Sequence, residues 1–301
     1  MCDIWKTPEA KELSSQDLDR HMASIGGMGV EWVVLTGGEP LMHSDLFRLC
    51  ALLRKRRIRI TILSTGLLLK RYAAQIVANA DDVIVSLDGP RDVHDRIRRV
   101  SGAFEMLAQG VHAIRAERSD FPISARCTVQ RLNHAVLRDT VASARRIGLT
   151  GISFLAADLT STAFNRLAVW DDARQMQIGL DRWQIEVLES EVESLVLAGE
   201  CGRFVAEEPE KLRKIVRHFR AHLGDAPPRA PVCSAPWVSV VVEANGVVRP
   251  CFFHPPIGKI DASTSLGDVV NSAEAVLFRN DLDVASNSIC RRCVCSLNWP
   301  H

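Results

Sequence analysis

The residues with the clearest chemical potential are cysteines, and five of the nine lie in the last quarter of the chain. Cys233 and Cys251 flank a stretch of strand-forming residues, and Cys290, Cys293 and Cys295 follow after a gap. The first residues lack the basic and apolar regions of a signal peptide, so we expect a cytoplasmic, reducing location in which clustered thiols hold metal. Thiolates on both sides of a β-hairpin, closed by a later C-x2-C, can supply four sulfur ligands. The sequence therefore predicts a C-terminal metal-binding module.

Two kinds of metal site fit this cysteine pattern. A structural zinc ribbon is also a hairpin closed by thiolates. Zinc sites favour a tight C-x2-C or C-x4-C as their first pair of ligands, whereas Cys233 and Cys251 are far apart in the sequence. The spacing alone leaves both an iron–sulfur cluster and zinc open.

A second set of polar residues follows the predicted strands of the first half of the chain. In LTGGEP, residues 35–40, Gly37 and Gly38 let the backbone pass close to a ligand, and the carboxylate of Glu39 can receive an amine. The other polar strand ends are Ser64-Thr65-Gly66, Ser86-Leu87-Asp88-Gly89, and Arg126 with Thr128. Because ligands of parallel barrels bind at the carboxyl ends of the strands, four such ends predict one shared pocket.

The elements that position these residues alternate between short apolar runs and amphipathic stretches. We expect strands at residues 32–36, 58–65, 82–89, 122–129 and 151–158, and helices at 44–56, 102–117 and 134–147. Ser44 is expected to cap the first of these helices, and Gly148 to end the last. Strands and helices that alternate at this spacing form right-handed βαβ units, and these build a parallel sheet or barrel.

The second half of the chain has a different pattern. Residues 170–223 read as long helices without strands, and the proline-rich segment 224–231 reads as a linker. Two β-rich runs within residues 237–251 then flank Asn245-Gly246, which is the strongest short signal for a hairpin.

Composition excludes several classes of function. The formal net charge is +1, from 37 basic and 36 acidic residues, so there is no electrostatic case for nucleic-acid binding or for a polybasic membrane anchor. No apolar run approaches the roughly 20 residues that a membrane-spanning helix needs. We therefore expect neither nucleic acid nor a membrane as a partner.

Residues GGEP at 37–40, the S-T-G turn at 64–66 and SLDG at 86–89 resemble the radical S-adenosylmethionine (radical SAM) superfamily. Its members bind a [4Fe-4S] cluster through C-x3-C-x2-C in the loop after the first barrel strand. Cys2 resembles the third cysteine of that motif, and GGEP begins 35 residues later, which is a typical spacing. By this resemblance, we expect the sequence as printed to begin inside the cluster loop, without the first two cysteines and the first barrel strand.

The C-terminal cysteines resemble the SPASM/twitch modules that hold an auxiliary cluster in this superfamily, in the shorter, single-cluster twitch form. The resemblance implies an auxiliary [4Fe-4S] cluster on Cys233, Cys251, Cys290 and Cys293, with Cys295 as a substitute for Cys293 or as a free thiol. Together with the barrel signals, it favours iron–sulfur over zinc.

The resemblance also implies the fold and its division. We expect an α/β fold: a partial (β/α)6 TIM-like barrel without its first strand, joined to a small cysteine-rich C-terminal module that contains a β-hairpin. The expected divisions are a barrel core at residues 1–160, a helical segment and linker at 161–231, and the cysteine-rich module at 232–301.

The barrel is then expected to bind S-adenosylmethionine. Glu39 would accept the methionine amine, Gly37 and Gly38 would allow close approach, and Ser86 and Arg126 would serve the ribose and the methionine carboxylate. The full set of cofactor-binding residues implied by the resemblance is Gly37, Gly38, Glu39, Pro40, Ser64, Ser86, Asp88 and Arg126.

The implied activity is reductive cleavage of S-adenosylmethionine to a 5′-deoxyadenosyl radical, which abstracts hydrogen from a small-molecule or peptide substrate. Oxidation of a sugar or alcohol and modification of a peptide both remain open, as does a redox-neutral reaction with the second module as scaffold. A reductase such as flavodoxin or ferredoxin would be the electron-donating partner. The competing hypothesis is an inactive protein that holds only a C-terminal cluster or structural zinc.

The position of Cys2 gives a testable prediction. One thiolate cannot hold a four-iron cluster in that loop, so the 301-residue chain, reduced with dithionite, is expected to make no 5′-deoxyadenosine above background. A chain extended upstream so that Cys2 completes a C-x3-C-x2-C motif is expected to make it, and Cys2→Ala in that chain should abolish it. Chromatography of the quenched reactions measures the product. Production by the 301-residue chain alone would contradict this interpretation of Cys2.

Overall fold

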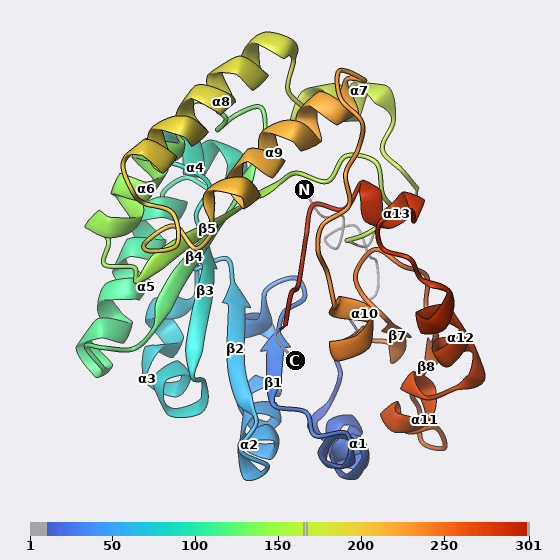
Figure 1. Cartoon of the computed structure of the whole chain (residues 1–301). Coiled ribbons are helices and arrows are strands. Elements are labelled where there is room, and N and C mark those ends of the chain that lie inside the picture. The colour runs from blue at the N-terminus through green and yellow to red at the C-terminus, as the bar shows by residue number, and fades with distance from the viewer. Residues whose placement is uncertain (1–10, 165, 167, 300–301) are drawn as a thin grey trace.

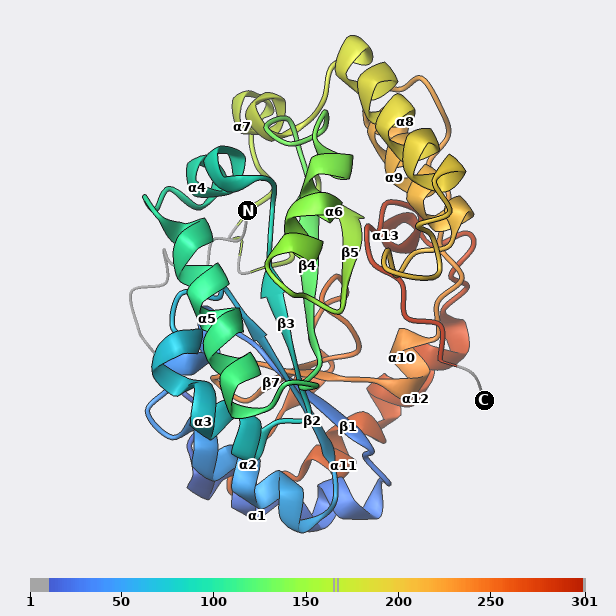
Figure 2. The same cartoon turned by 90° about the vertical axis from the view of Figure 1, so that its left-hand side faces the viewer.

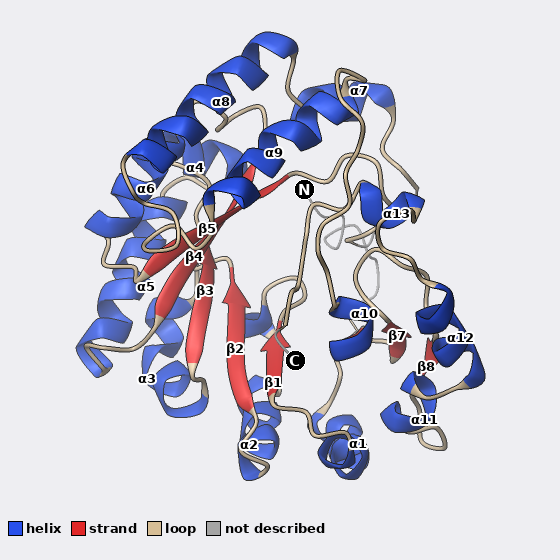
Figure 3. Cartoon of the chain, viewed as in Figure 1, coloured by secondary structure: helices blue, strands red, loops and turns tan. Residues whose placement is uncertain are grey.

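The computed structural model describes residues 11–164, 166 and 168–299 of the chain, so Cys2 lies outside the described residues. Within this part, five parallel strands form one sheet in the order β1-β2-β3-β4-β5 (Figures 1 and 3). The strands are β1 Trp32–Leu35, β2 Arg59–Ser64, β3 Asp82–Ser86, β4 Ile123–Val129 and β5 Gly151–Ala156. Each strand pairs with the next one in the chain, which confirms the parallel α/β fold predicted from the sequence.

Helices from the strand connections cover one face of this sheet, as the side view in Figure 2 shows. They are α2 Leu46–Lys55, α3 Leu69–Asn79, α4 Arg91–Arg98, α5 Ala103–Glu117 and α6 Leu137–Arg146. Along β4, Ala125 and Cys127 are buried, whereas Arg126 is exposed. Because side chains alternate between the two faces of a strand, the polar residues of β4 lie on the opposite face, here called the open face.

The sequence predicted the residue that caps the helix α2 and the residue that ends the helix α6. We predicted Ser44 as the N-cap of the helix at 44–56, which is wrong: the cap of α2 is Asp45, and the Ser44 hydroxyl donates to Glu12 instead. A carboxylate that competes for the hydroxyl removes it from the capping position. The α6 helix ends at Arg146, and Gly148 follows in the left-handed region at φ 85°, as its expected role at the helix end requires.

Helices follow the fifth strand, and a small second sheet follows the helices. The helices are α7 Asp172–Ile178, α8 Arg182–Leu197 and α9 Pro209–His222, and the α1 helix at Ser15–Gly27 precedes the large sheet. The predicted hairpin is confirmed, because β6 and β7 pair antiparallel and Gly246 takes a φ of 83° in the turn. A third strand, β8, was not expected. The bounds are β6 Val241–Val242, β7 Val247–Arg249 and β8 Gly258–Lys259, with α10 Ala235–Val238, α11 Leu266–Val270, α12 Ala273–Asp281 and α13 Ser288–Arg291.

The C-terminal module packs against the large sheet. The chain that follows α13 runs down beside β1 in Figure 1, and the Trp299 ring lies 6.0 Å from the ring of Trp32 on β1. The hydroxyl of Ser24 in α1 accepts a hydrogen bond from the backbone amide of Gly267 in α11 at 2.6 Å. Among the described residues, no helix is both long enough and apolar enough to cross a membrane.

Candidate functional site

Glu39 joins the ends of the first two strands. Its carboxylate accepts hydrogen bonds from the Ser64 hydroxyl at 2.9 Å and from the backbone amide of Thr65 at 2.7 Å. The Thr65 hydroxyl and the amide of Leu41 donate to it as well. Two carboxylate oxygens have about four acceptor sites, so in this state the strand ends occupy all of them. The structure thus brings together Glu39 and Ser64, as the sequence predicted, with Pro40 at the start of the short 3-10 helix Pro40–Met42.

The two glycines before Glu39 leave open space beside it. Gly37 has a φ of 147°, a conformation that side-chain-bearing residues rarely adopt. A Cβ built on Gly37 would meet no atom within 4 Å, and both Gly37 and Gly38 are exposed. The backbone at this strand end is therefore accessible to a ligand.

Asp88 is placed differently from the other candidates, because it has 0% exposure. Its carboxylate accepts from the backbone amide of Thr128 at 3.2 Å and pairs with the Arg98 guanidinium at 2.7 Å. Its own amide donates to Nδ1 of His94 at 3.1 Å, which places the proton of the ring on Nε2. Burial lowers the pKa of His94 to about 4, so the ring is neutral. Asp88 thus positions the ends of β3 and β4 and offers no surface to a ligand.

Ser86 and Arg126 are neighbours on the sheet. They are register partners in the pairing of β3 with β4, so their side chains leave the sheet on the same face. The Arg126 guanidinium donates to the Ser153 hydroxyl at 3.3 Å and is otherwise exposed. A serine hydroxyl and a guanidinium thus stand side by side on the open face, where they can bind hydroxyl and carboxylate groups.

The five C-terminal cysteines lie in one region. Burial is the main cause of raised pKa values among them, and neighbouring thiolates add to it: Cys251 raises the pKa of Cys290 and Cys293. Cys233 acts in the same way on Cys251 and Cys290. These mutual effects link the thiols of Cys233, Cys251, Cys290 and Cys293, although the residues lie far apart in the sequence.

The chemistry of this group suits a metal cluster. Burial raises the pKa of Cys290 to about 11 and that of Cys295 to about 11, so both are protonated in the metal-free chain, and binding must release protons. Within the described ranges, no group of three or more His, Cys, Asp or Glu side chains is placed to hold a metal ion. A four-iron cluster spreads its thiolates more widely than one ion does, because each binds a different iron. The thiols must therefore lose their protons before they can bind either a cluster or a single ion.

The three remaining described cysteines lie apart from this group. Cys50 is buried in α2 and Cys127 in β4. Burial raises the pKa of Cys201, and the side chains that act on it are Glu208, Arg213 and Glu207 rather than other thiols. These cysteines are not placed to share a cluster with the C-terminal five.

Aromatic residues and a histidine surround the cysteine group. His254 is 3% exposed, and its Nε2 lies 3.3 Å from the sulfur of Cys290. The ring of Phe252 stacks on Phe164 at 5.9 Å, and Phe253 meets Phe164 edge-on at 5.5 Å. The sequence gave no sign of Phe164 as the partner of these two rings, because it lies in a segment without a motif.

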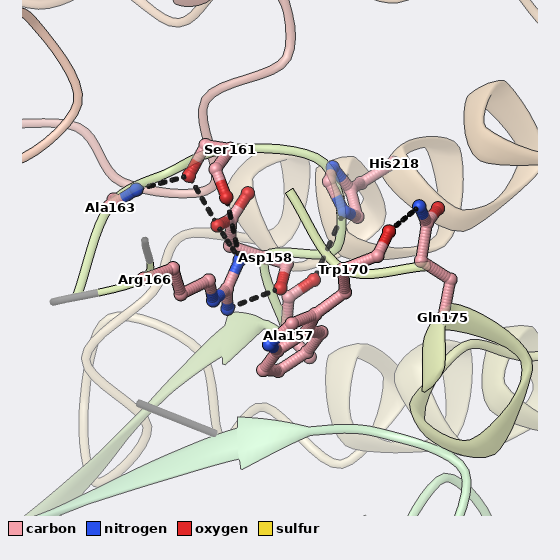
Figure 4. Close-up of polar contacts among 8 residues, drawn as sticks. All are labelled: Ala157, Asp158, Ser161, Ala163, Arg166, Trp170, Gln175 and His218. Atoms are coloured by element: carbon pink, nitrogen blue, oxygen red, sulfur yellow. Dashed lines mark hydrogen bonds and ion pairs between the residues drawn. The ribbon is translucent and has the colours of Figure 1, made fainter. Parts of the chain in front are cut away.

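A buried ion pair holds the loop that carries Phe164 (Figure 4). Arg166 donates to the carboxylate of Asp158 at 2.6 Å and to the backbone carbonyl of Asp158 at 2.8 Å, and both side chains are at most 3% exposed. The guanidinium also lies 3.7 Å from the ring centroid of Trp170. Sequence reasoning missed this pair, because nothing in the spacing of the two residues marks it out in a segment without a motif.

Two families of known proteins match this chain. Residues 1–140 match the radical SAM superfamily, and residues 233–294 match the SPASM iron–sulfur cluster-binding domain. The two matches fall on the strand-end site and on the cysteine group, respectively.

Curated relatives are similar over part of their length. The AdoMet-dependent heme synthase of Methanosarcina barkeri is 28% identical over 46% of this chain and 40% of that protein. The subtilosin biosynthesis protein AlbA of Bacillus subtilis is 23% identical over 93% of this chain and 56% of that protein. The chain thus covers well under two thirds of these relatives.

Solved structures share the fold at low sequence identity. Streptococcus suis SuiB bound to its precursor peptide SuiA has a TM-score of 0.63 at 14% identity, over 99% of this chain and 68% of that one. The structure of anSMEcpe with bound AdoMet has a TM-score of 0.61 at 15% identity, over 87% of this chain and 72% of that one. Both similarities support the α/β fold with its small C-terminal sheet.

The buried ion pair generates a stability prediction. Asp158→Asn removes the charge that compensates Arg166, which has almost no access to water, so we expect a loss of about 3 kcal/mol in the free energy of unfolding. The control is Glu105→Gln, whose pair with Arg91 is half exposed and should contribute less than about 1 kcal/mol. Urea denaturation of both variants measures the difference. Equal losses in the two variants would contradict the structural role of Asp158.

Proposed function

Because this chain belongs to the radical SAM superfamily and carries a C-terminal SPASM domain, we propose that it is an enzyme that cleaves S-adenosylmethionine reductively and abstracts hydrogen from a substrate. The observation that carries the proposal is the strand-end site, in which Glu39 meets Ser64 and Thr65 next to exposed glycines. The barrel cluster, when bound, would supply the electron that yields the 5′-deoxyadenosyl radical.

The strand-end residues would bind S-adenosylmethionine in divided roles. The Glu39 carboxylate would accept the methionine ammonium, and Gly37 and Gly38 would leave room for it. All acceptor sites of Glu39 are occupied by the chain itself, so the ammonium must displace one donor. The hydroxyls of Ser64 and Thr65 can turn away without moving the backbone, whereas the amides of Leu41 and Thr65 cannot. Amine binding would therefore replace one of these two hydroxyls.

Ser86 and Arg126 would complete the binding of S-adenosylmethionine from the open face. The guanidinium carries the charge that a methionine carboxylate needs, and the hydroxyl of Ser86 can bond to a ribose. Asp88 would act through position, because its bonds fix the strand ends on which Ser86 and Thr128 lie.

The SPASM domain would hold an auxiliary [4Fe-4S] cluster. Cys233, Cys251, Cys290 and Cys293 would be its ligands, and Cys295 a substitute for Cys293 or a free thiol. Buried His254 beside Cys290 and the apolar rings of Phe252 and Phe253 would limit the access of water to the cluster.

The substrate is either a small molecule or a peptide. Relatives of this chain include heme synthases and a bacteriocin biosynthesis protein, and their names show that they make products of different chemical classes. A reductase such as flavodoxin or ferredoxin would donate the electron.

The role of Glu39 can be tested in a chain that carries the complete cluster motif. Glu39→Gln keeps the shape of the side chain but loses the charge that holds the ammonium, so we expect 5′-deoxyadenosine formation to fall about tenfold or more. Glu31→Gln changes an exposed carboxylate at the other end of β1 and should leave the rate unchanged. An unchanged rate in Glu39→Gln would remove Glu39 from the proposed site.

The auxiliary cluster can be tested in the 301-residue chain itself. Anaerobic reconstitution should give about four irons and about four sulfides per chain, because the four proposed ligands are all present. Cys251→Ala should abolish this cluster, whereas Cys201→Ala, which changes a thiol outside the group, should retain it. Finding one zinc and no sulfide would show a structural zinc site instead and would contradict the iron–sulfur proposal.

A further inference from the structure

A large cavity opens beside the cysteine group. It has a volume of about 1120 Å³ and lies between α9, the linker at residues 227–232 and the segment that follows α13. Cys293 is part of its wall. This volume exceeds the several hundred Å³ of an ordinary small-ligand pocket, so the cavity can hold a molecule of substantial size.

The wall of this cavity carries an excess of positive charge. Three carboxylates line it, from Asp172, Glu208 and Glu210. The six cationic side chains that line it are Lys211, Lys214, Arg217, Arg229, Arg291 and Arg292. The formal net charge of the whole chain is only +1, so the cavity wall is more positively charged than the chain as a whole.

Several of these cations lack a partner among the residues that the structure describes. Arg217 pairs with Glu210, and Arg291 donates to the carbonyl of Pro228. In the part of the chain that the structure describes, no ion pair or hydrogen bond of the Lys214 or Arg292 side chain is found, although Lys214 is only partly exposed. Burial lowers the pKa of Lys214, and nearby thiolates including Cys293 counteract that effect. An unpaired, partly buried cation favours an anion from outside the chain.

Other cations of the same helix are paired and point elsewhere. Arg213 makes two hydrogen bonds of 2.7 Å to Glu193 on α8, and Arg220 bonds to Glu189 at 2.6 Å. Neither lines the cavity. The α9 cations that face α8 are therefore neutralised by carboxylates of that helix, whereas Lys214 on the cavity side has no such pair in the described chain.

The histidines of the cavity add no charge. Nε2 of His218 donates to the carbonyl of Ala157 at 3.2 Å, as Figure 4 shows, so its Nδ1 is the free acceptor. Burial lowers the pKa of His218 to about 4 and lowers that of His222 as well. Apolar side chains, such as Met176 and Val232, complete the wall. The lining thus offers cations for an anionic group and an apolar surface for the body that carries it.

We propose that this cavity binds a carboxylate- or phosphate-bearing organic molecule with an apolar body, and that Lys214 and Arg292 hold its anionic groups beside Cys293. The proposal deepens the proposed function, since it names the class of ligand that lies against the auxiliary centre. Anion binding does not require the cluster, so it can be measured on the cluster-free chain. Failure to bind the anion is then distinct from failure to assemble the cluster.

The test uses two fluorescent probes of the same shape, 1-pyrenebutyrate and the neutral 1-pyrenebutanol. Titrated into the cluster-free 301-residue chain, pyrenebutyrate is expected to bind more tightly than pyrenebutanol. Lys214→Gln and Arg292→Gln should each weaken binding of pyrenebutyrate by about three- to tenfold, as loss of one charged contact implies, and leave that of pyrenebutanol unchanged. The matched control is Arg213→Gln, one residue away on α9, which should change neither affinity.

Equal affinities for the two probes, or variants at Lys214 and Arg292 that bind pyrenebutyrate like the unchanged chain, would overturn the proposal. A further outcome is that neither probe binds but reduced flavodoxin does, with an affinity that falls in Lys214→Gln. That result would show a docking surface for an acidic protein and would also overturn the proposal of a small-molecule site.

Discussion

Parallel hydrogen bonding of five strands in chain order is the constraint on which the candidate site depends. Each crossover helix returns the chain to the same end of the sheet, so the five carboxyl ends share one edge. There, Glu39 bonds to residues at the end of β2, and Asp88, which follows β3, accepts from Thr128 on β4. A slip of one residue in either register would move Ser86 or Arg126 to the helix-covered face and dismantle the site.

The C-terminal module contacts residues of the large sheet and of the loop that follows it. Phe164, which the Asp158–Arg166 pair holds in place, stacks on Phe252 of the module. Burial raises the pKa of Cys295, and the Arg126 guanidinium of β4 counteracts that rise. A residue of the strand-end site therefore acts electrostatically on a thiol of the cysteine group, so the two sets of side chains are coupled.

Charge is distributed unevenly in a chain that is almost neutral overall. Surface pairs such as Arg213 with Glu193 neutralise many cations locally. The cavity next to Cys293 keeps several cations without a partner among the described residues. A nearly balanced composition thus gives no indication of a local binding surface, because it averages over pairs that only the folded chain forms.

The sequence by itself determined the elements and the chemical types. These predictions rest on local patterns, which can be recognised in the amino-acid sequence without the tertiary structure. The patterns are the strand periodicity, the glycines and carboxylate of GGEP, the Asn245-Gly246 turn and the cysteine spacing. Even here a bond between distant segments made one prediction wrong, since Ser44 bonds to Glu12 rather than capping α2.

Only the tertiary structure decided how these pieces act together. In the folded chain Asp88 is buried and positions the strand ends, and Glu39 accepts hydrogen bonds from its neighbours. Asp158 pairs with Arg166, and Lys214 has no partner in the described chain. Each of these outcomes depends on which side chains from separate segments meet and on how much water they keep, and no pattern of neighbours along the chain contains that information.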